Sequence, residues 1–349
     1  MNGSDMKKFA IRAVIWGGLC LAFTLLFSIL IDPYNVFHPL NIRDNGIEPD
    51  KNYIKMVYIL DNPQKFDTYM FGSSRVSSIH TEKLEGEKCY NMTYSSAVVW
   101  EHLDNVKTMI ANGVNIKKIY VGLDSMSYTS DIRGREDDPM RQSYEYSKAY
   151  PLKFWLDHLD TANTFKSLNT SLKHKSKDNF QEIFYGYGWS MDYDLPGMEY
   201  NIGAWSQPSI GDSPDADEQF DKVLECTGEL KNICDENDIE LVVFLHPVLF
   251  KAYVASKPQR YQEFMWELAQ ITDYYNFGGV NDLTVDYSNY TDPSHYTAQV
   301  GDILIDFFNN GTVDERLYEQ GFGWHVDADN VDELLDVLNA TEKWYSHYL

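Results

Sequence analysis

The stretch Asp67-Thr-Tyr-Met-Phe-Gly-Ser-Ser-Arg75 decides the fold of this chain. Its first five residues form a short apolar run typical of a buried β-strand, and this run ends directly at Gly72-Ser-Ser74. A serine in the turn that follows such a strand has an exposed hydroxyl and backbone amides nearby. The stretch therefore predicts a strand that delivers a chemically accessible serine.

Apolar runs elsewhere in the chain extend this strand into a sheet. We expect further strands at 88–92, 117–124 and 239–246, and helices at 96–112, 262–273 and 297–309. Nearly continuous apolar runs suit strands that are covered on both faces, as in a parallel sheet with flanking helices. The pattern predicts an α/β fold, a flavodoxin-like three-layer α/β/α sandwich with a mainly parallel sheet.

The N-terminus carries a candidate membrane anchor. Lys7, Lys8 and Arg12 precede an uncharged run at 13–31, which ends at Asp32-Pro33. About 19 residues at 1.5 Å each span roughly 28 Å, enough to cross a bilayer. A cleaved signal peptide is the alternative, but no small-x-small cleavage site follows the run. We expect residues 1–32 to form a cytoplasmic stub and a single uncleaved transmembrane helix, with the rest of the chain extracytoplasmic.

Composition narrows the function classes. The formal net charge is -24, from 29 basic and 53 acidic residues, which argues against nucleic acid as a partner. The hydrophobic content of 44% is ample for a packed core. The four cysteines have neither the spacing of a zinc site nor that of a disulfide scaffold. We therefore expect no metal and no other cofactor.

The alternation of strands and helices is interrupted once. We expect a main domain at 33–312 that contains an inserted cap at about 125–218, because so long an excursion between two core strands is seldom a plain loop. The insertion includes a predicted helix at 151–171 and three aromatic residues that either stack on sugar rings or pack in a core: Tyr185, Tyr187 and Trp189. Residues 313–349 are a predicted C-terminal helical appendix.

A second motif lies near the end of the main domain. Asp292-Pro-Ser-His295 places an aspartate three residues before a histidine, just ahead of the predicted helix at 297–309. Together with Ser74, these residues can make a catalytic triad, in which the imidazole takes the hydroxyl proton and the carboxylate orients the imidazole. The order and context of the motifs predict Ser74 as nucleophile, His295 as base and Asp292 as orienting acid. Ser73 is the fallback nucleophile; its alternative role is to cap the turn.

These motifs resemble a known superfamily. Gly72-Ser-Ser74 after a strand, Tyr90-Asn-Met92 before a helix, and Asp292-Pro-Ser-His295 before the last core helix are similar to the blocks of SGNH (GDSL-type) hydrolases. The resemblance is closest to the membrane-anchored branch that includes the lipoteichoic acid D-alanine transfer protein and alginate acetylation proteins, and it covers roughly residues 60 to 310. It implies the same roles for Ser74, His295 and Asp292.

The middle blocks depart from the family pattern. A glycine often follows the second strand in this family, where this chain has Asn91-Met-Thr93, and Gly122-Leu-Asp124 stands where the family has an asparagine. The expected oxyanion donors are therefore the amide of Ser74, an amide of the 93–96 loop that begins at Thr93, and the side chain of Asn91. Asp124 is a further substrate-site candidate. Arg75 either binds an anionic group or fixes the turn by pairing with a carboxylate.

Two other motifs are better explained structurally. Gly211-Asp-Ser213 spells a nucleophile motif, but Pro214 follows at once, so we expect a helix N-cap there. His246 ends a predicted strand without a carboxylate at triad spacing, and we interpret it as a polar strand-end residue rather than a base.

The sequence thus predicts a membrane-tethered, extracytoplasmic serine esterase or O-acyltransferase. The resemblance implies that it acts on acetyl or D-alanyl groups of a cell-surface glycan or glycopolymer, beside a multi-span membrane acyltransferase. The alternative is a catalytically inactive scaffold or glycan-binding subunit of a complex that modifies cell-envelope polymers.

Overall fold

The computed structural model describes residues 3–42, 46–123, 138–173, 216–256 and 260–346. The chain divides into two compact units. The anchor unit comprises Met1–Tyr58 and Asp137–Gln181, and the sheet unit comprises Ile59–Glu136 and Glu182–Leu349.

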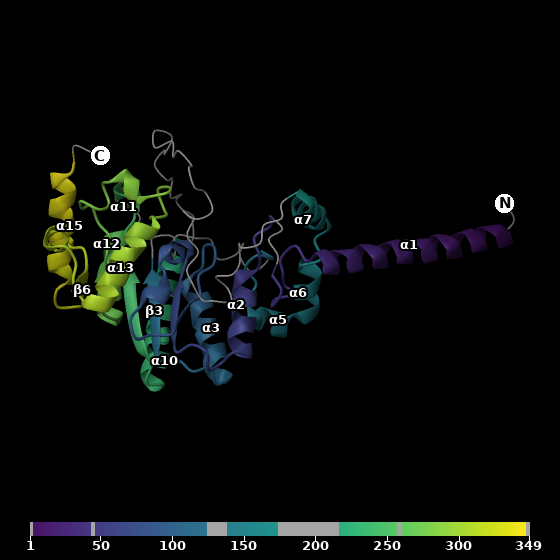
Figure 1. Cartoon of the computed structure of the whole chain (residues 1–349), viewed down its shortest axis with the longest axis horizontal. Helices are drawn as coiled ribbons and strands as arrows, with labels where there is room; N and C mark the ends of the chain where they lie inside the picture. Colours follow the sequence, from purple (N-terminus) through teal and green to yellow (C-terminus); the bar gives the residue numbers. More distant parts are fainter. Residues whose placement is uncertain (1–2, 43–45, 124–137, 174–215, 257–259, 347–349) are drawn as a thin grey trace. The chain divides into compact units, whose positions relative to one another are not determined.

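The sheet unit, drawn in Figure 1, contains a six-stranded sheet. Its strands lie in the order β2-β1-β3-β4-β5-β6. Neighbouring strands are parallel, except that β6 runs antiparallel to β5. The expectation of a mixed α/β fold with a mainly parallel sheet is therefore confirmed. The strands are β1 (Thr68–Gly72), β2 (Cys89–Asn91), β3 (Lys118–Leu123), β4 (Glu240–Leu245), β5 (Tyr274–Asn276) and β6 (Trp324–Val326).

Helices follow or separate these strands along the chain. Helices α3 and α10 pack against each other, α10 packs against α12, and α12 packs against α15. The helices of the sheet unit are α3 (Val99–Ala111), α10 (Ala216–Glu236), α11 (Phe250–Ser256), α12 (Tyr261–Ile271), α13 (Ala298–Asn310), α14 (Glu315–Glu319) and α15 (Val331–Trp344). Three 3₁₀ turns accompany them: η1 (Ser74–Ser78), η2 (Thr81–Lys83) and η5 (Tyr287–Asn289).

The C-terminal segment is more than an appendix. Its strand β6 pairs with β5 at the edge of the sheet, and its helix α15 packs on α12. Residues 313–349 therefore belong to the sheet unit. Three-residue pairings of this kind depend on the neighbouring strand more than on local sequence pattern, which is why the sequence did not predict β5 or β6.

The central strands are buried because both of their faces are covered. Every residue of β1 is buried, and so is β3 apart from its first residue. Burial of each large apolar side chain stabilises the fold by about 1.5–3 kcal/mol. Because the strands are parallel, their carboxyl ends meet at one edge. There Asn91 ends β2, His246 directly follows β4, and Ser74 lies two residues beyond the end of β1.

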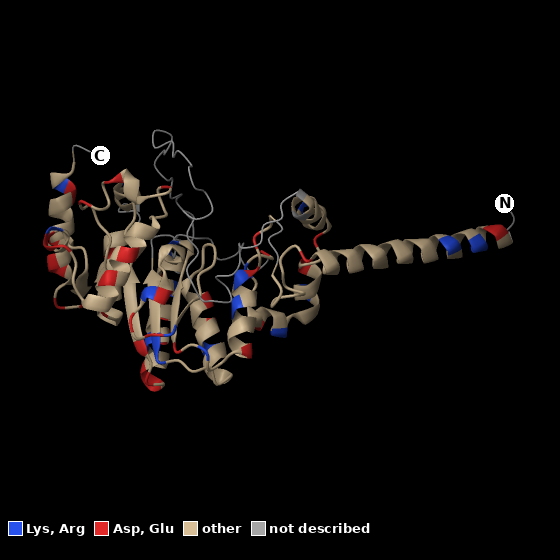
Figure 2. Ribbon diagram, viewed as in Figure 1, with Lys and Arg blue, Asp and Glu red and all other residues tan. Residues whose placement is uncertain are grey.

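The anchor unit begins with α1 (Gly3–Ile31), and its segment Ser4–Ile31 is long and apolar enough to span a membrane. The mean hydropathy of this segment is 2.4, and Figure 2 shows its charged residues confined to the N-terminal end of the helix. Helix α2 (Lys51–Asp61) starts in this unit, which also contains α5 (Tyr144–Ala149), α6 (Pro151–Asp157) and α7 (Thr161–Lys173).

The single helix expected at 151–171 is in fact two helices, so that prediction was wrong. Helix α6 ends at Asp157 with His158 as its C-cap, and Asp160 caps the start of α7 by accepting a hydrogen bond from the N–H of Asn163 at 3.0 Å. Aspartate competes for backbone donors in this way and favours a helix start over a helix interior.

Candidate active site

The nucleophile turn is built by a glycine and a serine. A Cβ on Gly72 would lie 2.2 Å from Cγ2 of Val76, so a side chain at this position would block the sharp turn from β1 into η1. Ser73 then caps η1, because its Oγ accepts a hydrogen bond from the N–H of Arg75 at 3.4 Å. Ser73, the fallback nucleophile, therefore occupies the capping position, and Ser74 is the first residue of η1.

The aspartate and the histidine share a tight loop. An isolated antiparallel bridge between Tyr290 and Tyr296 closes it. Inside the loop, Oδ1 of Asp292 accepts hydrogen bonds from the N–H groups of Ser294 at 2.7 Å and His295 at 3.0 Å. These two bonds fix the carboxylate and leave its other oxygen, Oδ2, facing the imidazole.

The structure brings the three residues of the expected triad together. Oγ of Ser74 lies 2.7 Å from Nε2 of His295, and Nδ1 of His295 lies 2.7 Å from Oδ2 of Asp292. A carboxylate partner holds the proton on Nδ1 and leaves Nε2 as an acceptor for the serine hydroxyl. The arrangement is therefore able to withdraw the hydroxyl proton from Ser74 as its oxygen attacks an acyl carbon.

The orienting acid is ionised at neutral pH. Burial alone raises the pKa of Asp292, but the hydrogen bond and positive charge of His295, together with the two backbone N–H groups, outweigh burial and lower the pKa below its ordinary value. An anionic carboxylate is what the relay requires, because it stabilises the imidazolium that forms when His295 takes the proton.

The two segments are locked together through backbone oxygens. Nε of Arg75 donates to the carbonyl of Ser294 at 2.8 Å, and Oγ of Ser78 donates to the carbonyl of Tyr296 at 2.8 Å. On the other side of η1, a Cβ on Gly301 of α13 would lie 1.8 Å from the carbonyl oxygen of Ser78. Arg75 thus contributes to fixing the turn through a backbone carbonyl; its two expected roles, binding an anionic group and pairing with a carboxylate, are not tested by this contact.

Two of the expected oxyanion donors, the side chain of Asn91 and the backbone N–H of Thr93, are engaged inside the fold. Nδ2 of the buried Asn91 donates to the carbonyls of Val76 at 3.0 Å and Ile79 at 3.3 Å, and its Oδ1 accepts the N–H of Thr93 at 2.9 Å. Oγ1 of Thr93 donates to the carbonyl of Ser73 at 2.6 Å. Because these donors are engaged in holding the turn, both residues support the nucleophile instead.

The amide of Ser74, a further expected oxyanion donor, differs from these groups. Among the residues that the structure describes, the backbone N–H of Ser74 has no hydrogen-bond partner. Asp124, the other substrate-site candidate, lies outside the described residues, as do the aromatic residues of the insertion and the motif at 211–213.

His246 is a buried polar residue. Its Nδ1 lies 3.1 Å from the hydroxyl of Tyr296, which directly follows His295 in the chain. This contact agrees with the interpretation of His246 as a polar strand-end residue. Sequence reasoning missed the roles of Ser78, Tyr296 and Gly301. Of these, only Gly301 gave a signal, because a glycine inside a predicted helix often marks a close approach between two segments.

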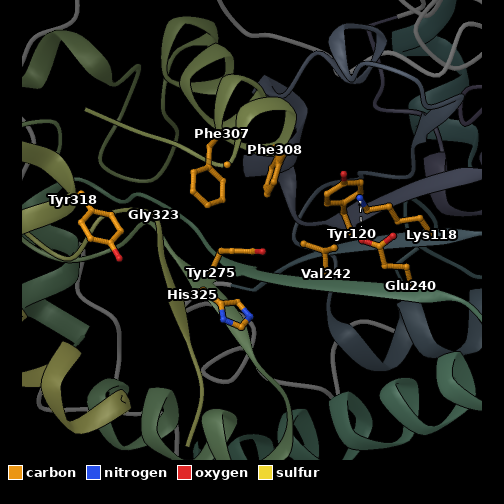
Figure 3. Close-up of a pocket in the computed structure, with 11 residues that line it drawn as sticks. Lys118, Tyr120, Glu240, Val242, Tyr275, Phe307, Phe308, Tyr318, Gly323 and His325 are labelled. Carbon is orange, nitrogen blue, oxygen red and sulfur yellow. Dashed lines mark ion pairs between the residues drawn. The ribbon is translucent and has the colours of Figure 1, made fainter. Parts of the chain in front are cut away.

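A separate pocket lies at the opposite edge of the sheet. Figure 3 shows Phe307 and Phe308 of α13 above Tyr275, in a pocket of about 350 Å³. Lys118 and Glu240, which also line it, are the first residues of β3 and β4, whereas Ser74 follows the carboxyl end of β1. The charged groups of the pocket are paired: Lys118 lies 3.1 Å from Glu240. This pocket is not part of the triad site.

The described part of the chain contains no group of three or more His, Cys, Asp or Glu residues arranged to hold a metal ion. In comparisons with known proteins, no model of a protein family matches this sequence, and no curated protein matches it.

Proposed function

We propose that this chain is a membrane-tethered serine esterase or O-acyltransferase. The observation that carries the proposal is the hydrogen-bonded relay from Ser74 through His295 to Asp292, with 2.7 Å at each step. Distances of this size lie in the range needed for proton transfer between a nucleophile and its base. Nothing in the packing of η1 requires such a relay, since Arg75 and Ser78 already hold the loop.

The proposed reaction has two steps. Oγ of Ser74 attacks the acyl carbon and passes its proton to Nε2 of His295, and the backbone N–H of Ser74 stabilises the oxyanion. The bond between the acyl carbon and the leaving alcohol oxygen then breaks, and His295 returns the proton to that oxygen. In the second step water or a sugar hydroxyl gives its proton to His295 as its oxygen attacks the acyl carbon. The bond between that carbon and Oγ of Ser74 then breaks, and His295 returns the proton to Oγ.

The substrate class follows from the resemblance to SGNH hydrolases and from the anchor. We propose acetyl or D-alanyl esters of a cell-surface glycan or glycopolymer as substrate, and a multi-span membrane acyltransferase as partner. The basic residues Lys7, Lys8 and Arg12 favour a cytoplasmic N-terminus, which makes the sheet unit extracytoplasmic. The three-layer arrangement of an SGNH domain remains part of this proposal.

One observation favours the second candidate, an inactive scaffold or glycan-binding subunit. The side-chain donor of Asn91 and the backbone N–H of Thr93, two of the expected oxyanion donors, are engaged inside the fold. Loss of one donor costs about 10²–10³-fold in rate, which weakens an enzyme without abolishing its chemistry.

Labelling with a fluorophosphonate probe separates the two candidates. The full chain is incorporated into lipid nanodiscs and compared with Ser74→Ala, His295→Ala and the matched control Ser73→Ala. An enzyme loses labelling in the first variant, slows by about 10³-fold or more in the second, and retains labelling in the third. Absence of labelling in the folded wild-type chain would refute the esterase proposal and favour the scaffold.

A further inference from the structure

Exposed leucines are confined to one part of the molecule. Outside α1, four leucines of the described residues are exposed, and all four lie in the anchor unit: Leu40, Leu152, Leu156 and Leu172. In the described part of the sheet unit, the large exposed apolar side chains are three aromatic ones: Trp266, Tyr318 and Trp344. An apolar surface that recurs in one unit and not in the other indicates a contact with an apolar environment.

The exposed apolar side chains form faces on two short helices. On α6, Leu152, Trp155 and Leu156 have the spacing i, i+3, i+4 and share one side of the helix; Leu152 is 73% exposed and Leu156 is 55% exposed. The opposite side of α6 packs inward through the buried Phe154. On α7, Leu172 is 77% exposed. Both helices are therefore amphipathic, with an apolar face left uncovered.

Helix α7 packs against the C-terminal end of α1, where the apolar segment of α1 ends (Figure 1). Oγ1 of Thr164 donates to Oγ of Ser28 at 3.1 Å, and the rings of Phe165 and Phe27 are 5.8 Å apart. On α1 itself, Leu30 is exposed on the same last turn. The apolar surface of α1 thus continues onto α7.

The segment that follows α1 also contacts α6 and the junction between α6 and α7. The hydroxyl of Tyr34, three residues beyond the end of α1, donates to Oδ2 of Asp160 at 2.9 Å. A little further along, the ring of Phe37 stacks on Trp155 of α6 at 5.2 Å. Tryptophan and tyrosine side chains favour the headgroup level of a bilayer, and the anchor unit carries Trp155, which contacts Phe37, and the exposed Tyr150.

The charge of this region also suits a lipid surface. Residues 32–58 and 138–173 contain eight acidic and eight basic residues, whereas the whole chain contains 53 and 29. The acidic excess that anionic headgroups would repel is therefore carried by other parts of the chain. Lys153 and Lys166 lie on α6 and α7 beside the apolar faces, where long basic side chains reach the headgroups.

We propose that α6 and α7 form an interfacial platform, seated in the headgroup region of the bilayer around the exit of α1. Helices of this kind bury their apolar face about 5–10 Å below the headgroup surface. The platform would fix the orientation of the anchor unit, because one crossing helix leaves rotation and tilt free and two further contacts do not. The inference rests on α1 crossing a bilayer and is independent of the chemistry at Ser74.

Depth-dependent quenching tests the platform. The full chain, with Cys20→Ala to remove its one exposed cysteine, is placed in phosphatidylcholine–phosphatidylglycerol nanodiscs; the other three cysteines of the chain are buried. A fluorophore is attached at Leu156→Cys, Leu172→Cys or the exposed control Asp332→Cys, which lies in α15 of the sheet unit. Lipids spin-labelled near the headgroup should quench the two platform positions about twofold or more beyond the control.

Two further results overturn the proposal. Quenching at positions 156 and 172 no greater than at 332 means that the helices lie in water. Shielding of those positions from aqueous iodide without quenching by lipid means that protein covers the faces instead. A label at Val14→Cys must be quenched by lipids spin-labelled deep in the acyl chain; failure there removes the spanning helix and the platform together, and leaves the fluorophosphonate result unaffected.

Discussion

Substitution of Gly301 by alanine is expected to disable the site from outside it. In the structure, the added Cβ would lie 1.8 Å from the carbonyl oxygen of Ser78 and 2.8 Å from its carbonyl carbon. Carbon and oxygen atoms of this kind approach no closer than about 3.3 Å, so α13 and η1 must separate by roughly 1.5 Å. Both sides of the contact are backbone, and neither yields by a change of rotamer.

The separation acts directly on the triad. Ser74 begins η1 and Ser78 ends it, while His295 lies a few residues before α13. A shift of that size takes the 2.7 Å contact between Ser74 and His295 beyond hydrogen-bonding distance. Misplacement by about 1 Å costs on the order of 10²-fold in rate, so we expect fluorophosphonate labelling to slow by about that factor.

Stability changes less than reactivity. Overpacking costs about 1–3 kcal/mol, and replacement of glycine by alanine inside a helix returns up to about 1 kcal/mol. The melting midpoint of Gly301→Ala should therefore fall by about 2–8 °C. The matched control is Gly228→Ala in α10, where the added Cβ meets Cγ2 of Ile271 at an ordinary 3.4 Å. It should label normally and melt no lower than the wild type.

The reasoning is refuted by a Gly301→Ala protein that labels at the wild-type rate. Circular dichroism at the labelling temperature shows that each variant is folded. A variant with a lowered midpoint but normal labelling would mean that the contact supports the fold without setting the distance between the nucleophile and its base.

Three other predictions follow from individual contacts. Asp292→Asn should slow labelling by about 10³–10⁴-fold with little loss of stability, because an amide supports the wrong tautomer of the imidazole; labelling within tenfold of wild type would exclude its role. In the anchor unit, burial lowers the pKa of His158, but the nearby carboxylate of Asp50 and hydrogen bonds to two backbone carbonyls outweigh burial and raise it, while burial raises the pKa of Asp50 to about 6. Both groups bind protons more tightly in the folded state, so stability is greatest at low pH and falls as pH rises from about 4 through the raised pKa values of both groups. Amide exchange in α6 and α7 should quicken across this range, and less so in His158→Gln. Thr93→Val removes a hydrogen bond to the buried carbonyl of Ser73 and should cost about 1–3 kcal/mol, measured by urea unfolding.

Local patterns predicted the parts of the fold that are locally determined. The strands β1, β3 and β4 are short, mainly apolar runs, so the hydrophobic pattern was sufficient to predict them. The grouping of Ser74 with Asp292 and His295 was predictable for a different reason. The carboxyl ends of parallel strands lie at one edge of a sheet, which places Ser74 there. The Asp-x-x-His spacing places Asp292 and His295 within one loop.

The remainder depends on tertiary contacts that no local pattern contains. Asn91 ends a strand at the expected edge, but packing turns its side chain inward, where it bonds the carbonyls of Val76 and Ile79. The edge strand β6 and the break between α6 and α7 likewise depend on what each segment meets in the folded chain.

The contacts between η1 and the loop at 290–296 determine which positions of this sequence can change during evolution. Their acceptors are the backbone carbonyls of residues 294 and 296, and the N–H of residue 294 is what Asp292 holds. Every amino acid except proline supplies that N–H and carbonyl. Position 294 can therefore exchange its side chain over evolutionary time without loosening the site, while the donors at Arg75 and Ser78 and the gap at Gly301 cannot. Sequences that share this candidate site are therefore expected to share a few isolated residues rather than a continuous motif.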